Sequence, residues 1–233
     1  MPDQRADPPR DRHARTRVPI HPPIAARWSP RAFDPEAVVT SEQLIALIEA
    51  ARWAATWGHR QPVRFVVGLR GDRRAGAERP GNLAEAFNAL SGLLRRGNSY
   101  AHAAGALILV CADEGEDERT ALYAAVDAGA AIANLSIEAV ARGLIAHPMA
   151  GFDVDGARTA FDLPDDVRPL AVVAVGALGD PAQVTPEIAE RDSRPRERLP
   201  LEEIVLNWSG AWPSSGAGAS QLAELGDDPV VEQ

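Results

Sequence analysis

Two arginine-rich segments carry the residues best suited to binding an anion. The first is the loop 27–31, RWSPR, in which two guanidinium groups flank a serine hydroxyl and a proline restrains the backbone. The second is the segment 191–198, RDSRPRER, near the end of the chain. Guanidinium groups are planar, permanently charged donors that can bind two oxygens of a phosphate at once. Each segment is a candidate phosphate site, and each is also compatible with a solvated charged loop.

Two further loops offer groups for a heteroaromatic ring. The loop 57–62, WGHRQP, lies between a predicted helix and a predicted strand, at the rim of a sheet where ligands collect. In the turn 148–152, PMAGF, Gly151 beside Ala150 can present backbone N–H groups to a ligand with no side chain in the way. A polar loop and an ordinary turn are the simpler interpretations. Trp57 and His147 are additional candidates near such a pocket, although His147 is equally explained by a hydrogen bond to the backbone.

The residue types that are missing exclude several chemistries. All 24 basic residues are arginine, so no lysine is present for a Schiff base, a phosphate loop or an SxxK acyl-transfer site. The single cysteine, Cys111, excludes an internal disulfide and a cysteine-ligated metal. The five histidines form no HxH or HExxH pair. The chemistry must therefore come from a cofactor or a substrate pocket.

The charge balance argues against nucleic acid and membranes as partners. The net charge of −9 should repel both nucleic acid and anionic lipid. No uninterrupted run of 18 apolar residues occurs, and the N-terminus lacks the apolar core of a secretory signal. We expect a cytoplasmic protein without a membrane span.

The candidate loops are separated by alternating helices and strands. Helix periodicity covers 41–56, with Ser41 as a plausible cap, and also 83–96, 118–143 and 153–162. β-branched or continuous apolar runs predict strands at 63–69, 105–112 and 170–176, while 143–153 is interpreted as an apolar passage from helix to turn. This order predicts an α/β or α+β protein built in three layers.

The two ends of the chain differ from the middle in composition. Residues 1–23 are rich in arginine, aspartate and proline and predict a disordered N-terminal arm. Residues 213–233 are small, polar and acidic, which predicts a flexible C-terminal tail. The range 24–212 then forms one folded domain.

In their order and spacing, these segments resemble the nitroreductase-like family of FMN-dependent oxidoreductases over roughly residues 24–208. The resemblance depends on the motifs RWSPRAFDPEAV with the LIEAARWA helix, TWGHRQPVRFVV, VDAGAAIANLSIEAVARGLIAHPMAGFD and PRERLPLEEIV. The resemblance implies an α+β three-layer sandwich, with a central, mainly antiparallel sheet flanked by helices. It also implies an intertwined homodimer with two FMN sites at its interface.

The resemblance assigns cofactor roles to particular positions. The residues it implies for FMN binding are Arg27, Trp28, Ser29, Arg31, His59, Gln61, Met149, Ala150, Gly151, Arg196 and Arg198. The arginine segments would bind the phosphate and ribityl chain, Gln61 would approach the flavin, and the 149–151 turn would offer backbone N–H groups to it. His59 stands where the family has asparagine and Val63 where it has tryptophan, which affects substrate choice and redox tuning.

The resemblance implies a ping-pong reaction. NADH or NADPH would supply electrons to FMN, and a nitroaromatic, quinone or flavin would accept them, with no catalytic side chain because the cofactor carries the chemistry. Two alternatives stay open: a flavin-dependent oxidase or desaturase of a small metabolite or peptide, and a flavin-binding protein with little turnover.

Overall fold

The centre of the protein is a four-stranded antiparallel sheet. The computed structural model describes residues 12–71, 83–207 and 210. The strands lie in the order β1-β2-β4-β3, and every neighbouring pair is antiparallel. Their bounds are β1 Val63–Leu69, β2 Ala106–Asp113, β3 Ile145–Met149 and β4 Val167–Gly176. The α+β class with an antiparallel sheet is therefore confirmed.

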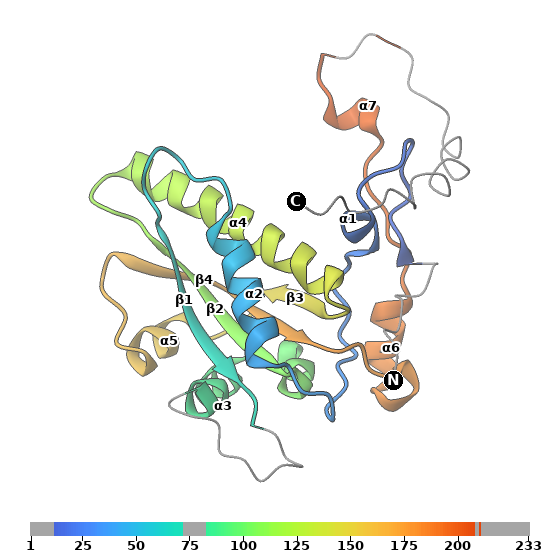
Figure 1. Cartoon of the computed structure of the whole chain (residues 1–233), viewed down its shortest axis with the longest axis horizontal. Helices are drawn as coiled ribbons and strands as arrows, with labels where there is room; N and C mark the ends of the chain where they lie inside the picture. The colour runs from blue at the N-terminus through green and yellow to red at the C-terminus, as the bar shows by residue number, and fades with distance from the viewer. Residues whose placement is uncertain (1–11, 72–82, 208–209, 211–233) are drawn as a thin grey trace, which may run out of the picture.

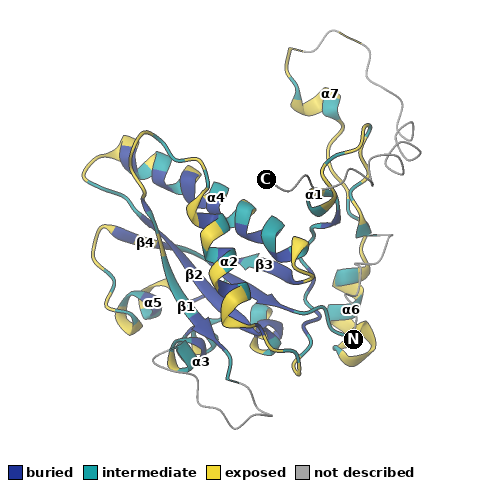
Figure 2. Ribbon diagram, in the orientation of Figure 1, coloured by how far each residue is buried: buried dark blue, intermediate teal, exposed yellow. Residues whose placement is uncertain are grey.

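Helices cover both faces of the sheet, so the molecule has three layers (Figure 1). The helices α2 (Ser41–Arg52) and α4 (Glu118–Ala141) pack on one face. The helices α3 (Leu83–Leu93) and α5 (Val154–Ala160) pack on the other. The central strand β2 is buried almost throughout, as Figure 2 shows, because it is covered on both sides.

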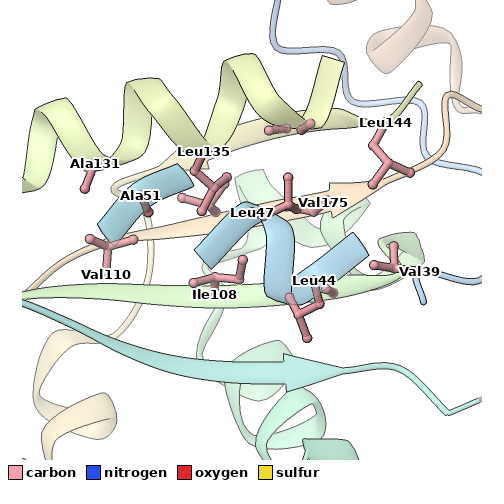
Figure 3. Packing of buried hydrophobic residues seen from close by; sticks show 14 of the residues in the cluster. Val39, Leu44, Leu47, Ala51, Ile108, Val110, Ala131, Leu135, Leu144 and Val175 are labelled. Carbon is pink, nitrogen blue, oxygen red and sulfur yellow. The ribbon is translucent and has the colours of Figure 1, made fainter. Parts of the chain in front are cut away.

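The two apolar layers draw on alternate residues of β2. Ile108 and Val110 face the α2–α4 side, where they pack with Leu47 and Leu135 (Figure 3). The neighbouring residues Leu107 and Leu109 belong to the cluster on the opposite side. This period of two is the geometry of a strand with helices on both faces.

Local sequence signals explain where the helices begin. At α2 the N-cap is Thr40, not Ser41, because the Thr40 hydroxyl accepts from the Gln43 backbone and the Gln43 side chain accepts from the Thr40 backbone. That helix ends at Arg52, four residues earlier than its apolar pattern predicts. At α4, the Asp117 carboxylate caps the first turn by accepting from the Thr120 backbone at 3.0 Å.

One predicted element is wrong. The segment Ile145–Met149 is a strand, β3, and not a passage from helix to turn. It pairs with β4 in the register Ile145 to Gly176 and Met149 to Val172. Pro148 made a strand hard to predict from the sequence, because proline is rare inside sheets. However, β3 is an edge strand of the sheet, where one side of the backbone lacks a ladder partner and proline is tolerated.

The helix α4 is long and apolar enough, by length and composition, to cross a membrane. In the fold it instead packs on the sheet, with Ala124, Ala131 and Leu135 buried. Asp127 is buried in its middle, where its carboxylate accepts from the backbone N–H of Trp57 at 3.0 and 3.1 Å. These contacts are those of a core helix.

The N-terminal and C-terminal segments lie beside each other at one end of the sheet (Figure 1). They contain α1 (Pro22–Ala26), α6 (Pro186–Ser193) and α7 (Leu201–Ile204). The Arg12 guanidinium donates to the Arg194 carbonyl at 2.8 Å, and Arg17 forms an ion pair with Glu202. Residues 1–11 of the predicted arm and 213–233 of the predicted tail lie outside the described residues, so the domain boundaries stay a prediction.

Candidate anion and cofactor site

The two arginine-rich segments meet in space and line one cavity, which we call the arginine pocket. Its volume is about 390 Å³, and it lies between the loop 27–31 and the residues that follow α6. The lining residues are Arg12, Arg27, Trp28, Ser29, Arg31, Arg191, Asp192, Arg194, Pro195, Arg196, Glu197 and Arg198. The structure therefore brings together six of the predicted site residues, although the two segments are about 160 positions apart in the sequence.

Several guanidinium groups of the arginine pocket, Arg191 among them, form no ion pair with a carboxylate of the described residues. Within the described ranges, Arg27, Arg196 and Arg198 form no ion pair with a carboxylate. Burial and then the neighbouring charge of Arg198 lower the pKa of Arg27. Burial lowers the pKa of Arg196 as well, followed by the charges of Arg27, Arg198 and Arg12. An anion bound here would relieve this repulsion.

Two residues that line the pocket, Trp28 and Arg31, each have a buried N–H group without an acceptor in the described part of the chain. The indole Nε1 of Trp28 and the Nε of Arg31 are buried, and neither has a hydrogen-bond partner among the groups that the structure describes. A buried donor left without a partner costs about 1–3 kcal/mol. Ligand oxygens could satisfy both, so the donor set fits a phosphate ester.

The backbone holds the arginine pocket in shape. The Arg196 guanidinium donates to the carbonyl of Arg27 at 2.8 Å and to the carbonyl of Arg12. The Arg27 guanidinium lies 3.4 Å from the Ser29 hydroxyl. The early and late segments are therefore joined directly by the side chains that are candidates for binding the anion.

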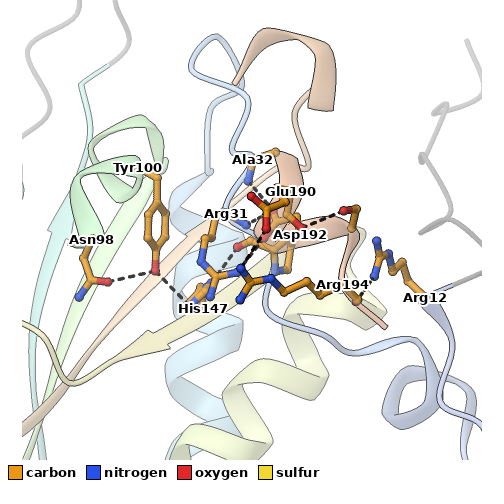
Figure 4. A network of polar contacts seen from close by, with 11 residues as sticks. Arg12, Arg31, Ala32, Asn98, Tyr100, His147, Glu190, Asp192 and Arg194 are labelled. Atoms are coloured by element: carbon orange, nitrogen blue, oxygen red, sulfur yellow. Dashed lines mark hydrogen bonds and ion pairs between the residues drawn. The ribbon is translucent and has the colours of Figure 1, made fainter. Parts of the chain in front are cut away.

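Arg31 differs from Arg27, Arg196 and Arg198 because a carboxylate neutralises it. Its guanidinium lies 2.8 Å from Oδ1 of Asp192, and its backbone N–H donates to Oδ2 at 2.6 Å (Figure 4). The backbone N–H of Ala32 donates to the same carboxylate at 3.3 Å. Sequence reasoning missed Asp192, and the signal that could have found it is an acidic residue inside an otherwise basic run. Asp192 fixes the loop 27–31 against α6.

The Gly151 turn follows directly after β3. The carbonyl of Gly151 accepts from the Arg95 backbone at 3.0 Å and from Nδ2 of Asn98 at 2.8 Å. The N–H of Gly151 donates to no group in the described part of the chain. Met149 is buried in the core, so only its backbone can serve a ligand, whereas Ala150 is exposed. The turn is thus shaped to offer main-chain donors.

The turn lies close to the loop 27–31 through His147. Nδ1 of His147 is 2.8 Å from the carbonyl of Pro30. The alternative offered for His147, a hydrogen bond to the backbone, is therefore present. This contact ties β3, which leads into the Gly151 turn, to the loop of the arginine pocket.

The loop 57–62 is not part of this assembly within one chain. Trp57 stacks on Tyr123 in the N-terminal half of α4, with ring centroids 4.9 Å apart. His59 and Gln61 are exposed. Figure 1 places this loop near one end of α4, a helix of 24 residues, and the segments that contain α1 and α6 near the other end. A helix of that length measures about 36 Å, so a single chain does not bring His59 and Gln61 to the arginines.

Comparisons with known proteins identify the family of the chain. A model of the nitroreductase family matches residues 24–177, a range that includes the loop 27–31 and the Gly151 turn. The chain is 67% identical over 150 residues to a Mycolicibacterium smegmatis protein named "Uncharacterized 15.4 kDa protein in ask 5'region", covering 64% of this chain and 97% of that one.

Two solved structures share the fold. A structure described as an oxidoreductase containing FMN aligns with a TM-score of 0.70 and 30% identity, over 84% of this chain and 94% of that chain. A nitroreductase family protein from Clostridium difficile 630 aligns with a TM-score of 0.57 and 26% identity, over 79% of this chain and 95% of that one.

Proposed function

The chain belongs to the nitroreductase family, and we propose that it is an FMN-dependent oxidoreductase that takes electrons from NADH or NADPH. It passes them to a nitroaromatic, quinone or flavin acceptor in a ping-pong cycle. The observation that carries this proposal is the arginine pocket: among the residues that the structure describes, several of its guanidinium groups pair with no carboxylate, and two buried N–H groups lack acceptors. The likeness to an oxidoreductase containing FMN supports the choice of cofactor.

The proposed roles follow from the contacts. Arg27, Arg196 and Arg198 bind the phosphate of FMN, and the indole N–H of Trp28 and the Nε of Arg31 donate to its oxygens. The Asp192 carboxylate keeps Arg31 in place. FMN supplies the electron-transfer chemistry, so the chain needs to bind and orient the cofactor and to exclude water from it.

A second copy of the chain would complete the site. Because the loop 57–62 lies near one end of α4 and the segments that contain α1 and α6 lie near the other, His59 and Gln61 can approach the flavin only from another molecule. Leu122 and Val126 are exposed on α4, four positions apart and so on one face of the helix, and Trp53 is exposed at the end of α2. We propose that this apolar surface forms the interface of a homodimer.

The interface is tested by Leu122→Asp, which would bury a charge between the subunits. We expect the wild-type protein to have the mass of a dimer in sedimentation and the variant to become a monomer that binds FMN more weakly. Glu116→Gln, an exposed change just before α4, is the control. A wild-type protein that is monomeric at micromolar concentration would refute the shared site.

The proposed function is tested by spectroscopy of the purified protein. We expect flavin absorbance after FMN is added, bleaching when NADH or NADPH is added without oxygen, and recovery when a nitroaromatic or quinone follows. Oxygen consumption with an organic donor and no NAD(P)H would favour the oxidase alternative, and negligible bleaching would favour a flavin-binding protein with little turnover. A protein that takes up no FMN would refute the proposal. The cytoplasmic location stays a prediction.

A further inference from the structure

A chain of three polar side chains joins the arginine pocket to the Gly151 turn. His147 lies on β3, and Asn98 and Tyr100 lie on a 3₁₀ helix that spans Arg96–Ala103. Nε2 of His147 is 3.0 Å from the hydroxyl of Tyr100, which is 3.3 Å from Oδ1 of Asn98 (Figure 4). At one end of this series, His147 bonds the carbonyl of Pro30, and at the other end Asn98 bonds the carbonyl of Gly151. We call these three residues the polar relay.

The hydrogens of the polar relay can be assigned from its two ends. A carbonyl oxygen only accepts, so Nδ1 of His147 carries a hydrogen toward Pro30 and the amide nitrogen of Asn98 faces Gly151. Burial raises the pKa of Tyr100 to about 12, so its hydroxyl keeps its hydrogen. Burial is also the main cause that lowers the pKa of His147. The single hydrogen of the Tyr100 hydroxyl is then shared between two acceptors, Nε2 of the neutral His147 ring and Oδ1 of Asn98.

The polar relay lies in apolar surroundings, where a polar group without a hydrogen-bond partner would destabilise the fold. Tyr100 belongs to the apolar cluster that also contains Met149 and Phe152. Polar groups in such a cluster must be hydrogen-bonded, and a network is sensitive to the loss of any one member. Its two ends are both backbone carbonyls, one inside the loop 27–31 and one in the Gly151 turn.

We propose that Asn98, Tyr100 and His147 are positioning residues that set the place of the Gly151 N–H relative to the arginine pocket. The proposal rests on the proposed binding of FMN, with its phosphate in the arginine pocket and its ring at the turn. Because one FMN molecule would contact both segments, their separation decides where the Gly151 N–H meets the ring once the phosphate is bound. The polar relay connects the two segments through hydrogen bonds to a backbone carbonyl of each.

The Gly151 turn packs closely against Asn98 of the polar relay. A Cβ at position 151 would lie 2.6 Å from Nδ2 of Asn98, and the next nearest atom, Cγ of Asn98, would be 3.6 Å away. The Asn98 amide therefore occupies the space that a side chain at position 151 would need. Gly151→Ala should displace this amide and disturb the polar relay from its other end.

The test uses Tyr100→Phe, which removes the hydroxyl and keeps the ring. Backbone donors at the flavin favour its reduced form, so displacing the turn should lower that preference. We expect the dissociation constant of FMN to change less than threefold, because the arginines are untouched. We expect the reduced-over-oxidised affinity ratio to fall at least tenfold, which for a two-electron couple lowers the midpoint potential of bound FMN by about 30 mV.

Asn98→Ala should lower the potential in the same direction, and it supplies the test if Tyr100→Phe fails to fold. Thr159→Val removes an exposed hydroxyl that bonds the Asp155 carbonyl on α5, and it should leave the potential unchanged. Variants that fold, bind FMN and keep the wild-type potential and absorption spectrum would overturn the positioning role. A wild-type protein that binds no FMN would instead refute the proposed function.

Discussion

Replacing Arg27 with alanine should weaken the binding of FMN and leave the stability of the FMN-free protein nearly unchanged. The Arg27 side chain bonds only the Ser29 hydroxyl, at 3.4 Å, and within the described ranges it pairs with no carboxylate. Burial and the charge of Arg198 already lower its pKa, so its charge is disfavoured in the protein without a ligand. Removing the charge should therefore harm the complex with FMN much more than it harms the free protein.

The size of the effect follows from the interaction that is lost. A hydrogen bond to a charged group contributes about 1.5–3 kcal/mol. At about 1.4 kcal/mol for each factor of ten, Arg27→Ala should weaken FMN binding by about 10- to 150-fold. The variant should also show a smaller loss of affinity with added salt, because one cation has left the pocket.

Quenching of flavin fluorescence during a titration with FMN measures the dissociation constant, and thermal unfolding without FMN measures stability. We expect the melting temperature of the free protein to stay within about 2 °C of the wild type, since like-charge repulsion is relieved as packing is lost. Arg168→Ala is the control, because Arg168 forms an exposed ion pair with Glu114 outside the pocket. FMN affinity within threefold of the wild type would refute the role of Arg27 in binding the phosphate.

Three further predictions concern the site and the core of the fold. Asp192→Asn weakens the acceptor that receives two backbone N–H groups and a guanidinium from the loop 30–32, so urea unfolding should show a loss of about 1–3 kcal/mol; an unchanged midpoint would contradict this. Gly68→Ala would place a Cβ 2.5 Å from the backbone of α3 and should cost more than about 2 kcal/mol, whereas Gly92→Ala, with open space around it, should be neutral or stabilising in the same assay. The lowered pKa of His147 means that the unfolded chain binds its proton more readily below about pH 6.5, so stability of the FMN-free protein should fall there by up to about 1.4 kcal/mol per pH unit. His147→Gln should remove that part of the slope, and an identical pH profile would show that another group causes it.

The individual elements could be predicted because their signals are local. The apolar run of β2, the β-branched residues of β1 and the periodicity of α4 each lie within a few turns of chain, and the structure contains all three. β3 was missed because its five residues include Pro148, and its strand character depends on pairing with β4 about 25 positions away.

The sequence by itself determined which groups can serve the site: arginine as the sole permanently charged cation, and a turn in which Gly151 adds no side chain. It could not show that Asp192 would neutralise Arg31 while Arg27 and Arg196 pair with no carboxylate in the part of the chain that the structure describes, because pairing depends on distance in space. Only the tertiary structure decided that His147 and Tyr100 connect the loop 27–31 to the Gly151 turn. Hydrogen bonds and ion pairs act over a few ångströms, and only folding brings residues more than 100 positions apart within that range.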